Sequence, residues 1–389
     1  MKILMIVYGF YEIDGRVQRA ATALKQKGYK VDVISLKWKN NENFNVYDGI
    51  KVHKILSRKF KETRQSQYLL KHLSFFILAT LMTSYLYIKE KYNLIYVNNI
   101  PDFLVFTTIL PKLFGSKIIL DIHDLVPEFA MQKFSLCENH IVVRTLKIIE
   151  RISVLYANHV ITVTDLWKQR LISRGISESK CSVVSNAPNL KLFNKKCLNG
   201  NNNNNNFTIV YHGNLSEQNG LNTLIKSISI IKDSIPSLLL IIIGELRKSH
   251  NLTELIKKSG VSGYINILSS IPHNEIPKLL LEADIGIDPK KDGVYSGETL
   301  SVKVMEYMAM GIPAIVSRTK ASNSYFNDSI VEFFESENHV DLANKILKLY
   351  NDSERRKELV VAANKYIKEY NWDNNKPKFY SLLDDLWQG

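Results

Sequence analysis

The sequence predicts an α/β protein of two domains, each built on a doubly wound parallel sheet, with a cleft between them. Three observations indicate this fold. The chain has 389 residues, about the length of two ordinary domains. Short runs rich in Ile and Val alternate with longer segments of helical periodicity, as in parallel α/β sheets. An asparagine tract near mid-chain interrupts the alternation, which then begins again.

The first half of the chain alternates expected strands with helices. The helix after the first strand runs through residues 16–28 and should end at Gly28, because glycine easily adopts the conformation that closes a helix. The strands are expected at residues 2–8, 30–36, 94–99, 117–123 and 159–164.

The asparagine tract, residues 199–206, contains no apolar side chain. Such a segment cannot contribute to a core, so we predict that it links a first domain, residues 1–198, to a second, residues 207–370. The alternative is a variable surface loop inside one domain.

The second half repeats the alternation, and ligand-binding residues are expected where its strands end. In doubly wound sheets, ligands bind beyond the carboxyl ends of the strands. Helices are expected at residues 221–234 and 301–311, and strands at 207–213, 237–244, 264–270, 283–289 and 313–317.

Composition restricts the partners and the location of the protein. The three cysteines form no C-x-x-C pair, which argues against a disulfide framework or a zinc site and fits a reducing cytosol. The first residues are typical of a strand rather than of a signal peptide. A net charge of +13 predicts attraction to an anionic partner. Nucleic acid is not expected, because its usual binding patterns are missing from the sequence.

Residues 51–88 allow two interpretations. Residues 51–71 contain seven Lys or Arg and one acid, and an uncharged apolar run, residues 73–88, follows. The first interpretation is a solvated basic loop before a buried helix. The second is a peripheral surface at the inner face of a membrane, because basic residues beside an apolar helix favour anionic headgroups. The run is too short and too polar to be predicted as transmembrane.

The motif DIHDLVPE follows the strand at 117–123 and places His123 beside carboxylates, Asp124 among them. A histidine in this position suits acid/base work or the binding of a substrate hydroxyl. A structural histidine is the alternative. The loop HGNLSEQNG, with Gly213 and Gly220, could bring free amides to a phosphate, although glycines also occur in such turns for steric reasons. Neither dinucleotide-binding nor P-loop spacing is present.

The segment GETLSVKVMEYMAMGIP, residues 297–313, contains a predicted helix that begins near Ser301 and ends at Gly311. With Ser301 as N-cap, the amides of Val302, Lys303 and the next residue would form an anion site. Lys303 and Glu306 lie three residues apart and share a face. They are either an ion pair on a solvated surface or side chains that face a cleft. Glu298 precedes the helix.

These motifs, in this order over nearly the whole chain, resemble those of the family 4 glycosyltransferases, retaining enzymes of the GT-B fold. The resemblance rests on DGRVQRAATALKQKGYKVDVISL, DIHDLVPE, VVSNAP, YHGNLSEQNGL, ADIGIDP and SVKVMEYMAMGIPAIVS. It implies two Rossmann-like domains, with a nucleotide sugar held mainly by the second. It also implies that a last helix, residues 371–389, crosses back onto the first domain.

The resemblance assigns roles by position. Glu306 matches the ligand of the nucleotide ribose, and Glu298 matches, by spacing, a glutamate that contacts the donor sugar. His123 matches a histidine near the sugar's anomeric region. Asp14, Gly15 and Arg16 match the loop beside the diphosphate and the acceptor. Many relatives carry cations where this chain has Asn214 and Asn219, so Lys303 is the expected replacement for the lost charge.

The expected activity is a retaining transfer from a nucleotide-diphosphate sugar to a glycan or lipid-linked acceptor, in surface or capsular polysaccharide biosynthesis. The sequence contains no D-x-D, so neither a metal nor another cofactor is expected. Two alternatives remain: a nucleotide-sugar epimerase on the same fold, and a non-catalytic sugar- or lipid-binding protein. An epimerase would need no acceptor.

Overall fold

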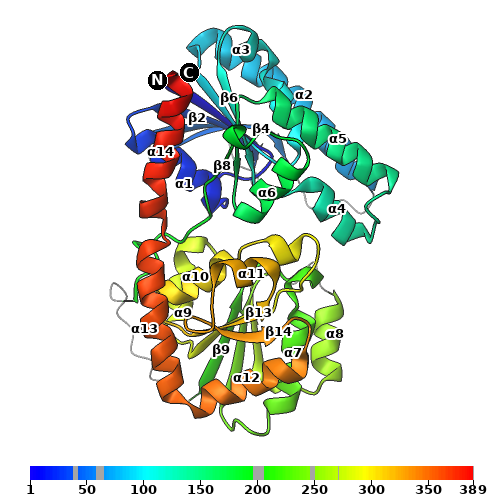
Figure 1. Cartoon of the computed structure of the whole chain (residues 1–389), viewed down its shortest axis with the longest axis vertical. Coiled ribbons are helices and arrows are strands. Elements are labelled where there is room, and N and C mark those ends of the chain that lie inside the picture. The colour runs from blue at the N-terminus through cyan, green and yellow to red at the C-terminus, as the bar shows by residue number, and fades with distance from the viewer. Residues whose placement is uncertain (38–42, 58–64, 196–205, 246–249, 270, 389) are drawn as a thin grey trace. The chain divides into compact units, whose positions relative to one another are not determined.

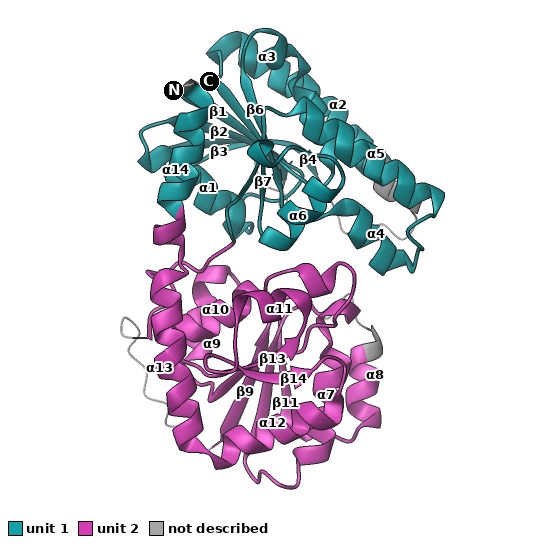
Figure 2. Ribbon diagram, viewed as in Figure 1, with its two compact units in different colours: residues 1–185, 376–389 teal, residues 186–375 magenta. Residues whose placement is uncertain are grey.

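The chain folds into two compact units, drawn in Figure 1 and coloured separately in Figure 2. The computed structural model describes residues 1–37, 43–57, 65–195, 206–245, 250–269 and 271–388. Unit 1 comprises residues 1–185 and 376–389, and unit 2 comprises residues 186–375. The division after Ser185 thus lies ahead of the expected boundary at residue 198. Most of the asparagine tract, residues 199–205, lies outside the described residues.

The described part of unit 1 contains an eight-stranded sheet in the order β3-β4-β2-β1-β5-β6-β7-β8. All neighbouring strands are parallel except β3 and β4. The central strands are buried at almost every residue, because helices cover both faces. The strands are β1 (Lys2–Val7), β2 (Lys30–Lys37), β3 (Phe44–Tyr47), β4 (Ile50–Ser57), β5 (Leu94–Asn98), β6 (Lys117–Ile122), β7 (His159–Thr162) and β8 (Cys181–Val183).

Along the chain, the helices of unit 1 alternate with most of its strands. The first of them, α1, ends before Gly28, whose φ of +88° confirms it as the closing residue. The helices are α1 (Gly15–Gln26), α2 (Gln65–Glu90), η1 (Asp102–Thr108), α3 (Ile109–Leu113), α4 (Val126–Phe134), α5 (Ile141–Tyr156) and α6 (Asp165–Ser173).

The predicted basic loop is wrong for residues 51–57, which form most of strand β4. The side chain of Lys54 is fully buried and forms an ion pair with Glu12. A lysine therefore occupies a position of the strand that faces the core. This charged residue interrupts the alternation of apolar and polar residues that would have predicted a strand. Residues 58–64 lie outside the described residues. The helix expected at 73–88 is longer, and the structure buries only one side of it.

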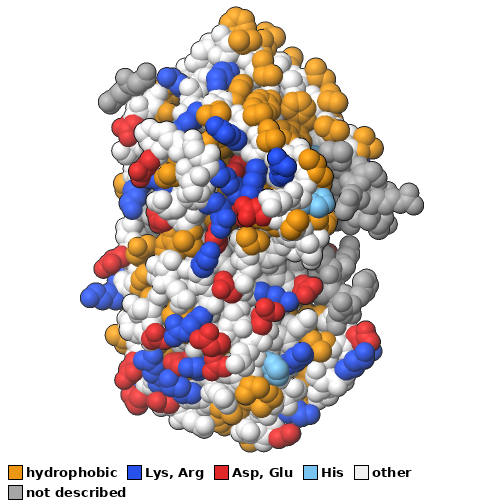
Figure 3. All heavy atoms as spheres, turned by 45° about the vertical axis from the view of Figure 1, so that its right-hand side comes forward, with side chains coloured by type: hydrophobic (Ala, Val, Ile, Leu, Met, Phe, Trp, Pro, Cys, Tyr) orange, Lys and Arg blue, Asp and Glu red, His pale blue; other side chains and the backbone are white. Residues whose placement is uncertain are grey.

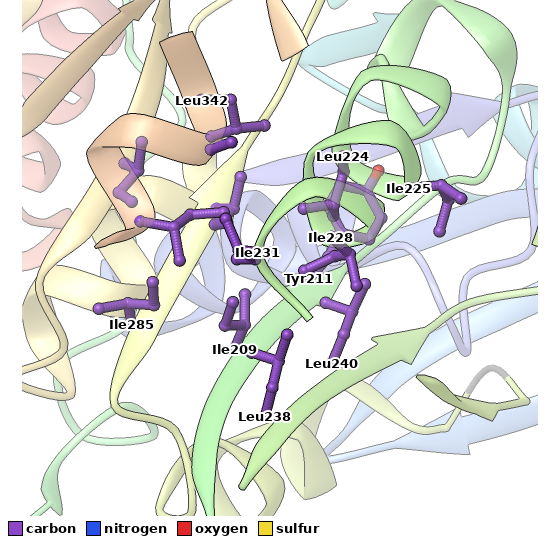
Figure 4. Packing of buried hydrophobic residues seen from close by; sticks show 14 of the residues in the cluster. Ile209, Tyr211, Leu224, Ile225, Ile228, Ile231, Leu238, Leu240, Ile285 and Leu342 are labelled. Atoms are coloured by element: carbon purple, nitrogen blue, oxygen red, sulfur yellow. The ribbon is translucent and has the colours of Figure 1, made fainter. Parts of the chain in front are cut away.

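Unit 2 contains a parallel sheet of six strands among its described residues, in the order β11-β10-β9-β12-β13-β14. Its core joins β9, β10 and β12 to helices α7 and α12, as Figure 4 shows for Tyr211, Leu224, Ile228 and their neighbours. The strands are β9 (Phe207–His212), β10 (Leu238–Ile243), β11 (Ile265–Leu268), β12 (Ile285–Asp288), β13 (Ala314–Arg318) and β14 (Glu332–Glu335).

The helices of unit 2 include α10, which lies among the buried residues of a second core cluster. The helices are α7 (Leu221–Ile231), α8 (His250–Lys258), α9 (Ile276–Leu280), α10 (Val302–Ala309), α11 (Lys320–Tyr325), α12 (His339–Asn351) and α13 (Ser353–Glu369). The last helix, α14 (Trp372–Gln388), begins in unit 2 and continues into unit 1.

Helix α14 is fastened to unit 1 by both polar and aromatic contacts. The Tyr380 hydroxyl donates to the carbonyl of Ala23 at 2.8 Å, and Lys27 Nζ lies 2.5 Å from Asp384 Oδ1. The ring of Phe379 packs edge-on against Tyr96 of β5. These contacts explain why residues from 376 onward belong to unit 1.

Each sheet has one topological switch point, where the strand order reverses. It lies between β1 and β5 in unit 1 and between β9 and β12 in unit 2. Ligands of doubly wound sheets bind beside the carboxyl ends of the strands at this point. Both switch points carry polar side chains of the sequence-predicted site.

Candidate functional site

Lys303 occupies the switch point of unit 2, at the start of α10. Its Nζ lies 3.2 Å from Asp288 Oδ1, at the end of β12, and donates to the Tyr211 hydroxyl of β9 at 3.3 Å. The ammonium also lies over the Tyr211 ring, 4.4 Å from its centroid. An ammonium has three N–H donors, and these two partners account for two of them. The side chain is therefore held in one position with donor capacity remaining.

Electrostatics keep the Lys303–Asp288 pair ionised although Asp288 is buried and the side chain of Lys303 is only 12% exposed. Burial by itself would lower the pKa of Lys303, but the carboxylate of Asp288 and the Tyr211 phenol outweigh it, so the pKa is raised. Burial would likewise raise the pKa of Asp288, but Lys303 and then Lys290 outweigh it and lower the pKa. A fixed positive charge thus lies beside the carboxyl ends of the central strands.

The loop after β9 lies directly against this lysine. A Cβ added at Gly213, where φ is +128°, would lie 3.5 Å from Lys303 Cε. Asn214 and Asn219, at the two positions where the resemblance suggests cations, hold the loop itself. Asn219 Nδ2 donates to the carbonyl of Asn214 at 2.8 Å, and Asn214 Oδ1 accepts from the amide of Ser216 at 3.0 Å. They therefore hold the backbone of the loop.

Gly220 closes this loop and begins α7 with a φ of +70°. A Cβ at this position would lie 1.7 Å from the carbonyl oxygen of Pro289, directly after β12. We expect Gly220→Ala to lower the free energy of unfolding by about 3 kcal/mol, because it combines a left-handed backbone with a backbone clash. Urea unfolding measures the loss.

Gly115→Ala is the matched control for this substitution. Gly115 has a φ of +91°, but no atom lies within 4 Å of the added Cβ. It should cost only about 1 kcal/mol, the backbone part alone. Equal losses in the two variants would contradict the close approach of the Gly220 loop to β12.

Glu306 lies on α10 at the same end of the sheet, buried between two histidines. Its Oε1 accepts from His273 Nε2 at 2.9 Å, and its Oε2 lies 3.3 Å from His212 Nε2. Burial lowers the pKa of His212 to about 4, against the opposing charge of Glu306. His212 is therefore neutral at ordinary pH. Lys303 and Glu306 consequently do not form the surface ion pair of the first interpretation, because each has other partners and is buried.

The remaining predicted residues of unit 2 have different surroundings. Glu298 is buried in a short 3-10 helix, Ser296–Glu298, and its Oε1 lies 3.2 Å from Lys320 Nζ at the start of α11. Val302 is the first residue of α10. Ser301 occupies the N-cap position, but its side chain makes no capping hydrogen bond. Ser301 is thus the N-cap, as the sequence predicts, and its side chain does not occupy the first amides of α10.

His123 lies at the switch point of unit 1, in a network with residues of β5 and β6. Its Nε2 lies 3.1 Å from Asn98 Oδ1 and 3.1 Å from Asp121 Oδ2. Asp121 Oδ2 also accepts from the Tyr96 hydroxyl at 2.6 Å. Because both partners of Nε2 are acceptors, this nitrogen carries the proton. Nδ1 is then the basic atom of the ring, and it is buried without a hydrogen-bond partner among the described residues.

Asp14 and Arg16 lie near this histidine, at the start of α1, and Gly15 is the first residue of that helix. Asp14 caps α1 by accepting from the amide of Arg16 at 3.1 Å, and its Oδ2 lies 3.2 Å from Arg16 Nη2. Burial would raise the pKa of Asp14, but the Arg16 charge outweighs it and, with a smaller contribution from His123, lowers the pKa to about 2.

Asp124 follows the same strand as His123 and joins the network through its backbone. Its carbonyl accepts from Asn99 Nδ2 at 2.7 Å. Burial would lower the pKa of Arg16, but the carboxylate of Asp14 and, to a smaller extent, that of Asp124 outweigh burial and raise the pKa. The structure thus gathers Asp14, Arg16, His123 and Asp124 at one end of the unit 1 sheet.

Sequence reasoning missed three residues of the unit 2 cluster: Tyr211, His212 and Asp288. His212 and Asp288 are the last residues of their strands, and Tyr211 directly precedes His212. A polar side chain at the carboxyl end of such a strand was a usable signal, because the same rule had already directed attention to the residues that follow strands. His273, in the loop after β11, offered no comparable signal.

Two family models match the chain. The model described as "Glycosyl transferases group 1" matches residues 198–366, and the model described as "Glycosyltransferase Family 4" matches residues 16–192. Together they span most of units 1 and 2. No curated protein sequence matches the chain.

Solved structures with the same fold cover almost the whole chain. Sucrose-phosphate synthase from Thermosynechococcus elongatus has a TM-score of 0.81 at 16% identity, covering 100% of this chain and 99% of its own. Anabaena HepE in complex with UDP-glucose has a TM-score of 0.73 at 15% identity, with 99% and 100% covered. WaaG, a glycosyltransferase involved in lipopolysaccharide biosynthesis, has a TM-score of 0.72 at 12% identity, with 98% and 99% covered. The two predicted Rossmann-like domains are thereby confirmed, with the fold of GT-B glycosyltransferases.

Proposed function

Because the chain belongs to the glycosyltransferases of group 1 and family 4, we propose that it moves a sugar from a nucleotide-diphosphate sugar to a hydroxyl of a glycan or lipid-linked glycan. The observation that carries this proposal is the largely buried ammonium of Lys303, fixed at the switch point of the unit 2 sheet. A departing nucleotide diphosphate needs positive charge, and preorganised charge in a water-poor site stabilises it strongly.

The donor would lie along the carboxyl ends of β9 and β12. Its diphosphate would accept from Lys303 and from the first amides of α10, which begins at Val302, while the Gly213 loop allows the close approach. Glu306 would accept the ribose hydroxyls. A carboxylate has about four lone-pair positions, so it can keep its histidine contacts and still bind the ribose.

The transfer step in this proposal retains the anomeric configuration. The bond from C1 to the phosphate oxygen breaks, the acceptor oxygen bonds to C1 on the same face, and the acceptor proton passes to the departing phosphate. Lys303 and the α10 amides supply the charge that a metal supplies in other transferases, so the scheme needs no metal. His123 would bind a sugar or acceptor hydroxyl through Nδ1. An inverted product would contradict this scheme.

The acceptor is proposed to belong to a surface polysaccharide or capsule, and to be carried on a lipid. The likeness to WaaG, whose description names lipopolysaccharide biosynthesis, supports such an acceptor. A lipid-linked acceptor would place the protein in the cytoplasm, peripherally at the inner face of the membrane.

A screen of nucleotide sugars by thermal unfolding tests the donor site. A donor at about 100 times its Kd stabilises a protein by about 2.7 kcal/mol, which should raise Tm by about 5 °C. UDP- and GDP-sugars would be compared, since HepE was solved with UDP-glucose. We expect one donor to give this shift, and Glu306→Gln to abolish it, because the substitution removes the negative charge and replaces one of the two oxygens that accept from the ribose by an NH2 donor.

Glu332→Gln is the control, because Glu332 is equally buried but lies at the start of β14, paired with Lys345 and Lys348. It should keep the donor-induced shift. A shift that survives Glu306→Gln would exclude Glu306 as the ribose ligand. Conversion of the donor without an acceptor would instead identify an epimerase, and donor binding without turnover across acceptors would identify a binding protein.

A further inference from the structure

Helix α2 presents an apolar stripe to solvent. Leu70, Leu73, Ile77, Leu81, Tyr85 and Ile88 recur every three or four residues and are all exposed. The opposite side of the helix is buried in unit 1 through Phe75, Ala79 and Leu86. Ile77, Leu81 and Ile88 expose 58%, 64% and 66% of their surface. The stripe is therefore open to solvent and does not belong to the hydrophobic core of unit 1.

Helices α5 and α3 extend this stripe into one surface. On α5 the exposed apolar residues are Ile141, Val142, Ile148, Ile152 and Leu155, and beside α3 they are Ile109, Leu113 and Phe114. We call the exposed residues of α2, α3, α5 and Phe114 the outer helical face. Figure 3 shows hydrophobic side chains gathered over this part of unit 1.

The three helices are held together beneath that face. Both α2 and α5 pack on η1, through ring contacts of Phe76 with Phe103 and of Phe106 with Tyr156. Phe114, directly after α3, stacks on Tyr87 of α2, and Lys112 of α3 donates to the carbonyl of Tyr156 of α5. The outer helical face is therefore a fixed surface and not a set of separate side chains.

The charges on and beside this face are positive. Arg144 and Arg151 are exposed on α5, and Lys89 and Lys91 are exposed at the end of α2. The sequences of α2, α3 and α5 contain two acids, and both are neutralised. Glu90 pairs with Lys2 and Lys30, and the buried Glu150 pairs with Arg174. The face thus combines apolar area with uncompensated positive charge.

A large exposed apolar patch indicates a binding surface, and its charge selects the partner. Apolar helices with basic flanks bind anionic bilayers, because the apolar side chains enter the headgroup region and each cation is attracted to the lipid charge. A symmetric dimer through this face would bring the arginines of two copies together. No helix among the described residues has the length and hydropathy to cross a bilayer.

We propose that the outer helical face of unit 1 docks on the surface of an anionic phospholipid bilayer, with α2 and α5 lying in the interface. This inference does not depend on the donor chemistry. It also moves the membrane contact from the basic segment 51–71, where Lys54 is buried and paired with Glu12, to a surface that includes α5, which the sequence did not single out.

Flotation of the full chain with vesicles tests the proposal. The protein should float with phosphatidylcholine vesicles that contain phosphatidylglycerol, and much less with phosphatidylcholine alone. Leu81→Asp with Ile148→Asp should reduce binding at least about tenfold, since each loses the burial of a large apolar side chain. Val361→Asp is the control, because Val361 is exposed on α13 of unit 2.

A second pair of variants tests how much the positive charge of the outer helical face contributes to vesicle binding. Arg144→Gln with Arg151→Gln should reduce binding about fivefold for each arginine. Lys258→Gln with Lys357→Gln changes the net charge equally on exposed side chains of unit 2, and it should leave most binding intact.

Three outcomes would overturn the proposal. The first is an absence of vesicle binding by the unaltered chain. The second is equal loss of binding in the face variants and in their unit 2 controls. The third is a dimer, seen by light scattering, that the face substitutions dissociate while vesicle binding stays unchanged, since the face would then be an interface between copies.

Discussion

Replacing Lys303 by methionine should slow sugar transfer by about two to three orders of magnitude, because it removes the fixed charge that the departing diphosphate requires. The same substitution should lower the free energy of unfolding by about 3–5 kcal/mol, since the buried carboxylate of Asp288 would lose its closest cation. Steady-state kinetics and urea unfolding measure the two effects separately.

The double substitution Lys303→Met with Asp288→Asn distinguishes a structural from a catalytic role. It removes both charges of the pair, so most of the lost stability should return. The transfer rate should stay low, because the diphosphate still lacks its cation. If the double variant regained the transfer rate together with the stability, Lys303 would act only by holding the end of the sheet together. Tyr211 loses the hydrogen bond from Lys303 in both variants but should keep its own bond to the carbonyl of Asn214, so the two variants differ only at Asp288.

The strands that the sequence predicted well are those buried on both faces. β10 is a continuous run of Leu and Ile, and most residues of β1 and β9 are also apolar, as is usual for parallel strands buried on both faces. β4 was missed for a physical reason. Its inward position at Lys54 is a charged residue, and the residue that neutralises it, Glu12, lies 42 positions earlier in the chain. A local pattern cannot reveal such a partner.

The same limit applies to the candidate site. Position along the strands predicted that Lys303, Glu306 and Gly213 would lie at the end of one sheet. The strand ends could also have pointed to Asp288 and His212, but the pairing of side chains could not be predicted, because Asp288, His212 and His273 come from other strands and loops than α10. The outer helical face is a second feature that the sequence pattern alone could not predict in full. Hydropathy located the apolar run of α2, but only packing shows which of its faces stays exposed.

Arg174→Met should produce the largest loss of stability in unit 1, about 3–5 kcal/mol above neutral pH. Arg174 follows α6 and forms ion pairs with Glu128 of α4 and with Glu150 of α5. Both carboxylates are almost fully buried. The guanidinium therefore ties three helices together, and its removal leaves buried negative charge without its main partner.

The stability lost in Arg174→Met should depend on pH, in a direction that the pKa of Glu150 determines. Burial raises the pKa of Glu150 from 4.5 to about 7, although Arg174 opposes the shift. Between these values the folded protein keeps a proton that the unfolded chain releases, so the stability contributed by this group falls as pH rises. Without Arg174 the pKa of Glu150 rises further. Below about pH 7 Glu150 keeps its proton in both folded proteins, so its share of the destabilisation should be small there and should grow as pH rises above 7.

Urea unfolding across that pH range measures the effect, and Arg356→Met provides the comparison. The Arg356 guanidinium bonds the carbonyls of Leu349 and Tyr350, which do not titrate. Its loss should cost the same at every pH. If Arg174→Met were equally destabilising below and above pH 7, the lost packing of a long side chain would explain it better than stranded charge. A loss of stability that grows with pH would indicate that the ion pairs of Arg174 hold α5 in position. The arginines and the exposed apolar residues of α5 would then depend on these ion pairs for their outward direction.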